Sequence, residues 1–415
     1  MSLPLQKGAG TGVKVLCSCL PGSGHFLPML PLAQALADAG HDVRFATAAD
    51  FCPSIAKRGF GTFSAGMSLA QQLEEAGQRY PEAQLAPGKQ RFETFVPQML
   101  AGVAAPSRAE DVVSVIGEWR PDVVVHDETE FGAPVAAAKF GIPYADQSVG
   151  ILRPLAMARL AGQVLAPLWR KYDVDLGSYG GLFRYLYLDV CPPSLQSKEI
   201  DQVGVAHRAH NLSAGTAADG ATPEWIGALP KRPTVYVSLG TIFNRDKSVF
   251  AAILEGLRDE QLNVIVTVGN NNDPADLGPQ PGHVHVERFI PQALILPHCD
   301  VVINQGGTAI LDILGHGLPV LVLPQGANQF HNAEACVTSG VGRALMPDQV
   351  TADAVRRELS TVLEEPSYRA RAQAIRREFA SMPGPATGVE LVERLAAERV
   401  ALPNTASVQG PVPRP

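Results

Sequence analysis

Two loops in the first half of the chain carry side chains that could move a proton. Residues 21–27 read Pro-Gly-Ser-Gly-His-Phe-Leu, which puts His25 on a turn between an apolar run and a helical pattern. A neutral imidazole at such a turn can take a proton from a hydroxyl near neutral pH. Asp127 ends a second apolar run, and a carboxylate there could orient His25 and stabilise its charged form. Both have ordinary alternatives, because His25 could cap a helix or face solvent and Asp127 could cap the next helix.

The turn around His25 is not a dinucleotide fingerprint. It contains Gly-Ser-Gly at 22–24 but has Leu27 where the third glycine belongs. No acidic residue closes the second strand at the usual distance for a ribose, so we exclude a nicotinamide site. The pair Asp173 and Asp175 resembles acidic residues that hold a metal on sugar nucleotides, but its irregular surroundings favour solvated surface. We therefore expect no metal ligands.

A second kind of chemistry is indicated in the second half of the chain. Gly306, Gly307 and Thr308 follow an apolar run and precede a helical pattern. Two glycines let the backbone approach an anion, and free N–H groups with the helix dipole could hold phosphate. No Gly-Lys-Ser/Thr follows, so this is not a Walker A loop, and a tight turn without ligand is an equal alternative. Asn328 and Gln329 follow another apolar run, where amides suit a hydroxyl-rich ligand.

The elements that must position these loops alternate between strands and helices, which predicts parallel βαβ units. In the first half we expect strands at 13–19, 42–46 and 122–126, with helices at 27–39, 92–119 and 131–140. The second half starts the pattern again, with strands at 234–238, 263–268, 284–286, 301–304 and 320–323 and a helix at 247–258. We predict two doubly wound α/β domains that face each other across a cleft, since ligands bind at the carboxyl ends of such strands.

The predicted boundaries follow changes in composition. We expect tails at 1–12 and 403–415, a first domain at 13–209, a turn-rich linker at 210–233 and a second domain at 234–402. The last helix could pack back on the first domain. Residues 151–189 are less regular and rich in aromatics, which suits the lining of an apolar ligand site, although a plain helical excursion is the commoner explanation.

Length and composition set the outer limits. A chain of 415 residues is long enough for two domains, and 46% hydrophobic with 18% charged residues excludes global disorder. The net charge of −7 leaves no basic footprint for nucleic acid or a membrane surface. The aromatic content of 6% also argues against a stacking platform for single strands.

The six cysteines form no C-x-x-C pair, and Cys17 and Cys19 alternate within one predicted strand. Buried free thiols in a reducing, cytoplasmic setting are the expected result. No secretory signal and no apolar run near 18 residues is present, so we expect no membrane association.

Taken in order, these pieces resemble the GT-B nucleotide-sugar glycosyltransferases of family one, most closely the bacterial enzymes that decorate natural products. Gly24-His-Phe-Leu-Pro28 looks like the family's G-H-x-x-P, whose histidine is the general base, and Asp127 stands where its partner aspartate is expected. The resemblance covers nearly the whole chain between the tails. It implies an acceptor site in the first half and a donor site in the second.

The resemblance also implies which residues bind the donor. Phe289 would lie against the nucleobase and Asp312 near the ribose, while the glycine turn would hold the diphosphate. The full implied set comprises Ser238, Gly240, Thr241, Phe289, Gln292, Gln305, Gly306, Gly307, Thr308, Asp312, Asn328 and Gln329. Two members depart from the family pattern, because Gln305 replaces a histidine and Asn328 replaces an acidic residue.

The resulting hypothesis is an inverting, metal-independent transfer of a sugar from a UDP- or dTDP-linked donor to a hydroxyl of an apolar acceptor. It requires no cofactor beyond the nucleotide sugar, and its partners are that donor and a small-molecule aglycone. A homodimer remains open. The alternatives are a GT-B nucleotide-sugar epimerase and a non-catalytic nucleotide-sugar-binding or partner protein, the latter kept by the altered Gln305 turn.

Overall fold

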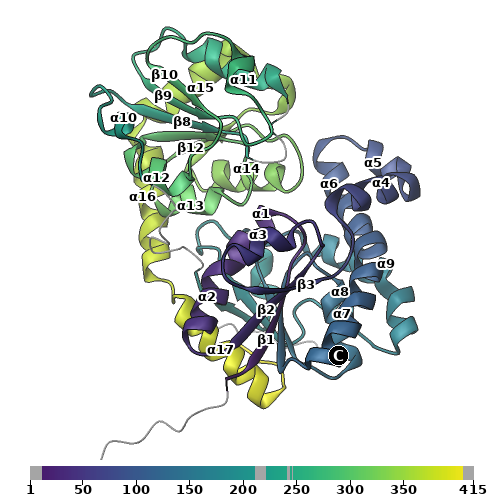
Figure 1. The fold of residues 1–415 in the computed structure, drawn as a ribbon. Helices are drawn as coiled ribbons and strands as arrows, with labels where there is room; N and C mark the ends of the chain where they lie inside the picture. The colour runs from purple at the N-terminus through teal and green to yellow at the C-terminus, as the bar shows by residue number, and fades with distance from the viewer. Residues whose placement is uncertain (1–11, 211–220, 241–243, 245, 405–415) are drawn as a thin grey trace, which may run out of the picture.

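The computed structural model describes residues 12–210, 221–240, 244 and 246–404. They form two domains, each built on a parallel β-sheet flanked by helices (Figure 1). The first sheet has the order β3-β2-β1-β4-β5-β6-β7. Its strands are β1 Lys14–Ser18, β2 Asp42–Thr47, β3 Gly61–Ser64, β4 Val123–Asp127, β5 Tyr144–Gln147, β6 Leu186–Asp189 and β7 Ala206–Arg208.

The helices of the first domain fill the connections between these strands. They are α1 Ser23–Phe26, α2 Leu30–Asp38, α3 Cys52–Ala56, α4 Leu69–Arg79, α5 Pro81–Leu85, α6 Gly88–Met99, α7 Ala105–Trp119, α8 Gly132–Lys139 and α9 Leu155–Tyr172. A π-helical turn at Leu100–Ala104 joins α6 to α7, so the helix expected over 92–119 is confirmed with an earlier start.

The second sheet has the order β10-β9-β8-β11-β12-β13. Its strands are β8 Thr234–Ser238, β9 Asn263–Thr267, β10 Val284–Glu287, β11 Val301–Asn304, β12 Val320–Val322 and β13 Gly342–Ala344. The helices are α10 Glu224–Gly227, α11 Lys247–Leu257, α12 Gln292–Ile295, α13 Ile310–Gly315, α14 Gln329–Thr338, α15 Ala352–Glu364, α16 Pro366–Ser381 and α17 Pro385–Glu398.

Both sheets arise from apolar runs that are buried on both faces, as parallel strands require. Every residue of β4 and β9 is buried. In each sheet the strand order reverses beside the first strand, between β1 and β4 and between β8 and β11. At such a point the two connecting loops diverge, which leaves room for ligands at the carboxyl ends of the strands.

The irregular segment at 151–189 is more ordered than its sequence indicates. It contains the 18-residue helix α9 and the fully buried strand β6. Asp173 and Asp175 follow α9 and are exposed, which confirms the interpretation of this pair as solvated surface. All six cysteines are free, and burial raises the pKa of the Cys17 thiol to about 12.

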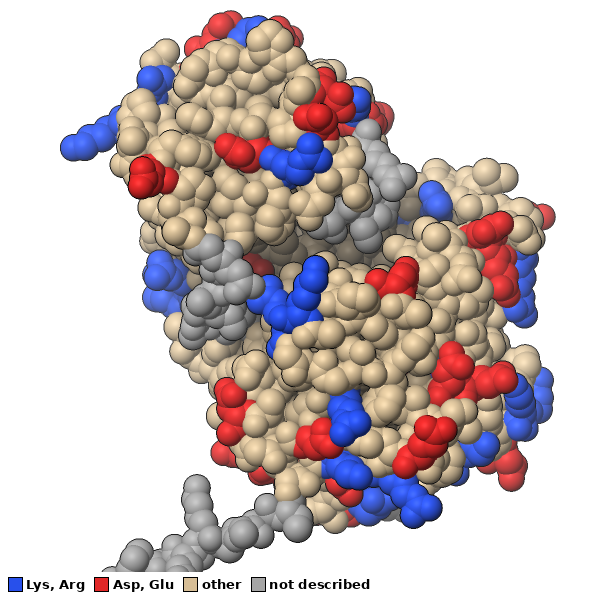
Figure 2. Space-filling model, viewed as in Figure 1, with Lys and Arg blue, Asp and Glu red and all other residues tan. Residues whose placement is uncertain are grey.

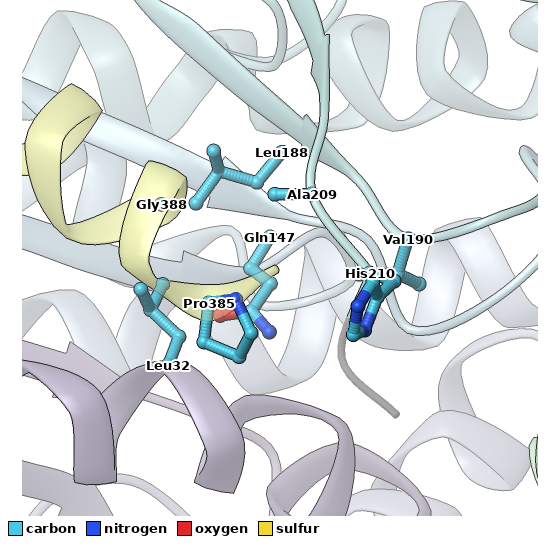
Figure 3. Close-up of a pocket in the computed structure, with 8 residues that line it drawn as sticks. All are labelled: Leu32, Gln147, Leu188, Val190, Ala209, His210, Pro385 and Gly388. Atoms are coloured by element: carbon cyan, nitrogen blue, oxygen red, sulfur yellow. The ribbon is translucent and has the colours of Figure 1, made fainter. Parts of the chain in front are cut away.

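The two domains are joined by more than the linker. Helix α17 lies against α2 of the first domain, where a Cβ on Gly388 would stand 2.8 Å from Leu32 Cδ1. Figure 3 shows Pro385 and Gly388 of α17 around a small pocket with Leu32, Gln147 and the end of β7. The chain therefore passes from the first domain to the second and back again.

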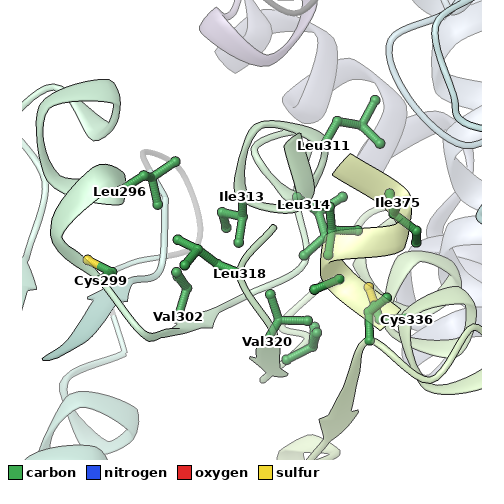
Figure 4. Close-up of a cluster of buried hydrophobic side chains, with 14 of the residues drawn as sticks. Leu296, Cys299, Val302, Leu311, Ile313, Leu314, Leu318, Val320, Cys336 and Ile375 are labelled. Atoms are coloured by element: carbon green, nitrogen blue, oxygen red, sulfur yellow. The ribbon is translucent and has the colours of Figure 1, made fainter. Parts of the chain in front are cut away.

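The core of the second domain also reaches across this junction. Leu296, Ile313 and Leu314 pack under its sheet (Figure 4). Val190 and Leu195, which follow β6 of the first domain, belong to the same apolar cluster. None of the described helices is long and apolar enough to cross a membrane.

Candidate active site

The loops predicted to do chemistry lie at the two points where strand order reverses. In the first sheet, β1 leads into α1 with His25, and the neighbouring β4 ends at Asp127. The register pairs Ser18 with His126, which brings the residues that follow each strand to one edge. Figure 2 shows a recess between the two domains, and side chains of both charges scattered over that face.

His25 and Asp127 meet through Thr129. The Nδ1 atom of His25 is 3.4 Å from Asp127 Oδ1 and 3.1 Å from Thr129 Oγ1. The Thr129 hydroxyl also contacts Asp127 Oδ1. These contacts engage Nδ1 of the imidazole and do not involve Nε2. The His25 side chain is 30% exposed. The arrangement is that of a base oriented by a carboxylate.

Asp127 is completely buried and ionised. The backbone N–H groups of Leu20 and Thr129 each donate to a different carboxylate oxygen at 2.8 Å. Burial alone would raise the pKa of Asp127, but His25 and these hydrogen bonds hold that pKa well below its usual range. The alternative role of Asp127 as a helix cap is not observed, because Glu130 accepts from the first N–H groups of α8.

A second buried pair supports the end of β4. His126 Nε2 lies 2.7 Å from Asp146 Oδ1 on β5, and its Nδ1 lies 3.0 Å from the Asp127 carbonyl oxygen. Burial opposes a charge on this imidazole, but the Asp146 carboxylate outweighs it and raises the pKa of His126. The strand end that carries Asp127 is thus fixed on both sides.

In the second domain, β11 leads into the Gly306 turn. Gly306 has a φ of 83°, and a Cβ there would stand 2.7 Å from Val322 Cγ1, so glycine is required. Asn304 Oδ1 accepts the Gly306 N–H at 2.7 Å, and Asn332 Nδ2 donates to the Gly306 carbonyl at 2.7 Å. Side-chain amides from β11 and from α14 therefore hold the turn in place.

This turn offers unused donors. Within the described part of the chain, the backbone N–H groups of Gly307, Thr308 and Ala309 have no hydrogen-bond acceptor. A Cβ on Gly24 would lie 3.3 Å from Thr308 Oγ1. The turn that carries His25 and the glycine turn of the second domain therefore approach each other so closely that one added methyl group would bridge them.

Gln305 packs into the first loop of the second domain. Gly240 has a φ of 75°, and a Cβ there would overlap Gln305 Nε2 at 2.2 Å. The Gln305 side chain is 8% exposed, and its Oε1 has no partner among the described residues. Ser238 ends β8 beside β11 in the register Asn304 to Ser238, whereas Thr241 lies outside the described residues.

The remaining residues expected to bind the donor lie on separate elements of the second domain. Phe289 is 54% exposed after β10, which leaves a free aromatic face, and Gln292 begins α12. Asp312 lies in the first turn of α13. Asn328 precedes α14, and Gln329 at its start is buried and accepts the N–H groups of Gln325 and Gly326 through Oε1. Gln329 therefore shapes its own loop.

A largely apolar pocket, open to solvent, adjoins the His25 site. Thr129, which contacts His25, lines it, and so do the buried Glu128 and its partner Arg153. The other lining residues are Val96, Pro97, Leu100, Phe131, Leu152, Pro154, Met157, Ala158, Ala161, Leu182 and Phe183. Most of the wall comes from 151–189, the segment whose composition suited an apolar ligand site.

Sequence reasoning did not identify Thr129, Glu128 or Arg153. Thr129 stands two residues past Asp127, a spacing at which a hydroxyl can bond the same carboxylate, but that signal is weak alone. Arg153 had no sequence signal, because its partner Glu128 is 25 residues earlier. Among the described residues, no group of three or more His, Cys, Asp or Glu side chains is placed to hold a metal ion.

Two family models match consecutive parts of the chain. The erythromycin biosynthesis protein CIII-like N-terminal domain matches residues 34–240, and the corresponding C-terminal domain matches residues 251–397. Aclacinomycin-T 2-deoxy-L-fucose transferase of Streptomyces galilaeus is 30% identical over 93% of this chain and 97% of that relative. L-demethylnoviosyl transferase of Streptomyces niveus is also 30% identical, over 93% of this chain and 98% of that protein.

Solved structures share the same two-domain arrangement. The glycosyltransferase SsfS6 of Streptomyces sp. SF2575, complexed with thymidine diphosphate, has a TM-score of 0.74 at 22% identity. The match covers 92% of this chain and 99% of that one.

Proposed function

Because this chain belongs to the erythromycin biosynthesis protein CIII-like family of GT-B glycosyltransferases, we propose that it transfers a sugar from a nucleoside diphosphate to a hydroxyl of an apolar natural product. The expected GT-B fold and enzyme class are confirmed. The close approach of the His25 turn to the glycine turn supports the proposal, since it would place the base beside the donor diphosphate.

In the proposed reaction His25 is the general base. Its Nε2 removes the proton of the acceptor hydroxyl as that oxygen attacks the anomeric carbon and the bond from this carbon to the diphosphate oxygen breaks. Attack opposite the leaving group inverts the anomeric configuration. Asp127 stabilises the imidazolium that forms at 3.4 Å, and such general-base assistance contributes about 10²–10⁴-fold.

The donor would occupy the second domain. The free N–H groups of Gly307 and Thr308 and the Thr308 hydroxyl would bind the diphosphate, with Gln305 and Thr241 beside it. These donors can stabilise the leaving group without a metal ion, which is why the proposed mechanism includes none. Phe289 would stack on the base, and Asp312 and Asn328 would bind ribose and sugar hydroxyls. The thymidine diphosphate complex of SsfS6 supports a thymidine donor.

The acceptor would enter this pocket, because its wall is apolar and Thr129 joins it to the base. Six free cysteines fit a reducing compartment, and we include a cytoplasmic location in the proposal. The relatives named above favour transfer over a nucleotide-sugar epimerase or a non-catalytic partner protein.

The test is acceptor-dependent release of thymidine diphosphate from a panel of thymidine-linked sugars, followed by mass spectrometry of the product and NMR of its anomeric centre. We expect a glycosylated product with inverted configuration, and loss of at least 100-fold in turnover for His25→Ala. Full activity of His25→Ala would contradict the assignment of the base. Isomerised donor without transfer would support the epimerase instead.

A further inference from the structure

The pocket beside His25 contains one pair of charged side chains that the proposed reaction does not use. Arg153 and Glu128 both line it, with Arg153 Nη1 2.8 Å from Glu128 Oε1. Apart from these residues and Thr129, the lining is apolar. An ion pair in such a wall costs desolvation, so its presence calls for an explanation beyond stability.

Glu128 is held from behind. Its side chain is 4% exposed, its Oε2 accepts the Tyr187 hydroxyl at 2.7 Å, and its Oε1 accepts from Arg153 and more weakly from the Val149 N–H at 3.4 Å. Most of its accepting capacity is therefore satisfied within the protein. Its role is to fix the guanidinium rather than to bind a ligand itself.

Arg153 keeps donors that the described part of the protein does not satisfy. A guanidinium has five N–H donors and no acceptor, and among the described residues only the bond from Nη1 to Glu128 is formed. Each nitrogen of Arg153 either has a hydrogen-bond partner or is accessible to solvent, and the side chain as a whole is 17% exposed. The unused donors are therefore available to a molecule in the cavity.

Phe183, another residue of the wall, is also held in an unusual conformation. Phe183 has a φ of 63°, and its N–H donates to the buried Asp146 Oδ2 at 2.6 Å. Its ring packs edge-on against Tyr187, with centroids 5.1 Å apart. A left-handed backbone at a bulky residue persists only where the surroundings hold it, and such positions concentrate at ligand sites.

We propose that Arg153 binds an uncharged carbonyl oxygen of the acceptor, so that the preferred acceptors are apolar ring systems with a ketone, quinone, lactone or amide group besides the reacting hydroxyl. Because a guanidinium can only donate hydrogen bonds, it stabilises a ligand oxygen that accepts them and does not stabilise a ligand group that can only donate. Glu128 already neutralises Arg153, so a carboxylate ligand would meet a site without net charge. This inference rests on the proposed function, because it assumes that the cavity is the acceptor site.

The test compares three fluorescent probes of one shape, namely 6-acetyl-2-naphthol, 6-ethyl-2-naphthol and 6-hydroxy-2-naphthoate, titrated in the presence of thymidine diphosphate. We expect the acetyl probe to bind the native protein about tenfold more tightly than either of the others. In Arg153→Met that advantage should fall below about twofold. Arg159→Met is the matched control, because Arg159 is exposed on α9 and pairs with Tyr179.

Because Arg153→Met leaves Glu128 buried without its partner, the double variant Arg153→Met/Glu128→Gln removes both charges and should lose the same preference while melting near the native temperature. Equal binding of the acetyl and ethyl probes to the native protein, or a preference that survives in both variants, overturns the inference. Preference for the naphthoate overturns it as well.

A failure of the acceptor site itself is distinguished by Ala158→Phe, which fills the cavity from α9. This variant should weaken the binding of all three probes about equally. If the probes bind it as they bind the native protein, or bind no form at all, the assignment of the cavity as acceptor site is wrong and the inference falls with it.

Discussion

Replacement of Asp127 by Asn removes one charge from the site and leaves its shape. The native carboxylate lies 3.4 Å from His25 Nδ1, and at an effective dielectric of about 20 this corresponds to about 5 kcal/mol of attraction for an imidazolium. Because His25 is 30% exposed, solvent screening reduces the usable part to about 2 to 3 kcal/mol. The turnover number should therefore fall about 30- to 150-fold.

The same substitution carries a cost in stability. Each carboxylate oxygen of Asp127 accepts one backbone N–H, from Leu20 and from Thr129, so the amide of Asn must point its own donors at one of them. The buried mismatch costs about 1 to 3 kcal/mol. The low native pKa of Asp127 adds stability that is present above its unfolded pKa of about 3.9 and is lost as the pH falls further. The difference in Tm between native protein and variant should thus narrow in acid.

The assay measures turnover at saturating donor and acceptor, with melting curves at pH 7 and pH 3. Thr129→Val is the comparison, because it removes the hydroxyl that bridges His25 and Asp127 but keeps the charge. We expect less than a tenfold loss for that variant. A folded Asp127→Asn enzyme with turnover within threefold of native would refute the argument. A loss of turnover in Thr129→Val larger than that in Asp127→Asn would refute it as well.

Three further predictions concern the second domain and the end of β6. Burial raises the pKa of Asp189 to about 6, so ionisation of this carboxyl lowers the stability of the native protein as the pH rises from about 4 to 6. In urea unfolding, Asp189→Asn should therefore increase the free energy of unfolding by about 3 kcal/mol at pH 7 and by little at pH 4. Phe289→Ala should weaken thymidine diphosphate binding about 5- to 50-fold in calorimetry without lowering Tm, whereas Phe140→Ala, at another exposed phenylalanine, should not change that binding. Gly306→Ala should abolish that binding, because its Cβ meets Val322, while Gly278→Ala, at a similar φ of 69° in open space, should lower Tm slightly and keep full affinity.

The strands that lead into the His25, Asp127 and Gly306 loops were predictable because they are continuous apolar runs. That pattern identified β1, β4, β8 and β11, and the rule that ligands bind at strand ends then placed His25 and Asp127 near each other. Strand β5 was missed for a physical reason. Its sequence Tyr-Ala-Asp-Gln has no apolar run, because the buried Asp146 pairs with His126 rather than with solvent.

The cavity could not be derived from the sequence for a different reason. Its wall depends on the path of α9 and on a tertiary pair between Glu128 and Arg153. Neither local periodicity nor motif spacing encodes such a pair. The short edge strands β3 and β7, of four and three residues, likewise depend on neighbours for their conformation.

The return of α17 to the first domain has a consequence for synthesis of the protein. Val392, Leu395 and Leu402 belong to the same buried cluster as Val15 and Phe26, so the core around β1 includes residues from the last part of the chain. A ribosome that adds about 5 to 20 residues per second needs on the order of 10 to 40 s to extend the chain from β7 to Leu402. Throughout that interval the apolar surface of α2 that α17 will cover remains open on the nascent chain. The first domain to emerge is therefore the last to be completed, and a stop codon shortly before α17 would leave the first domain, rather than the second, without part of its core.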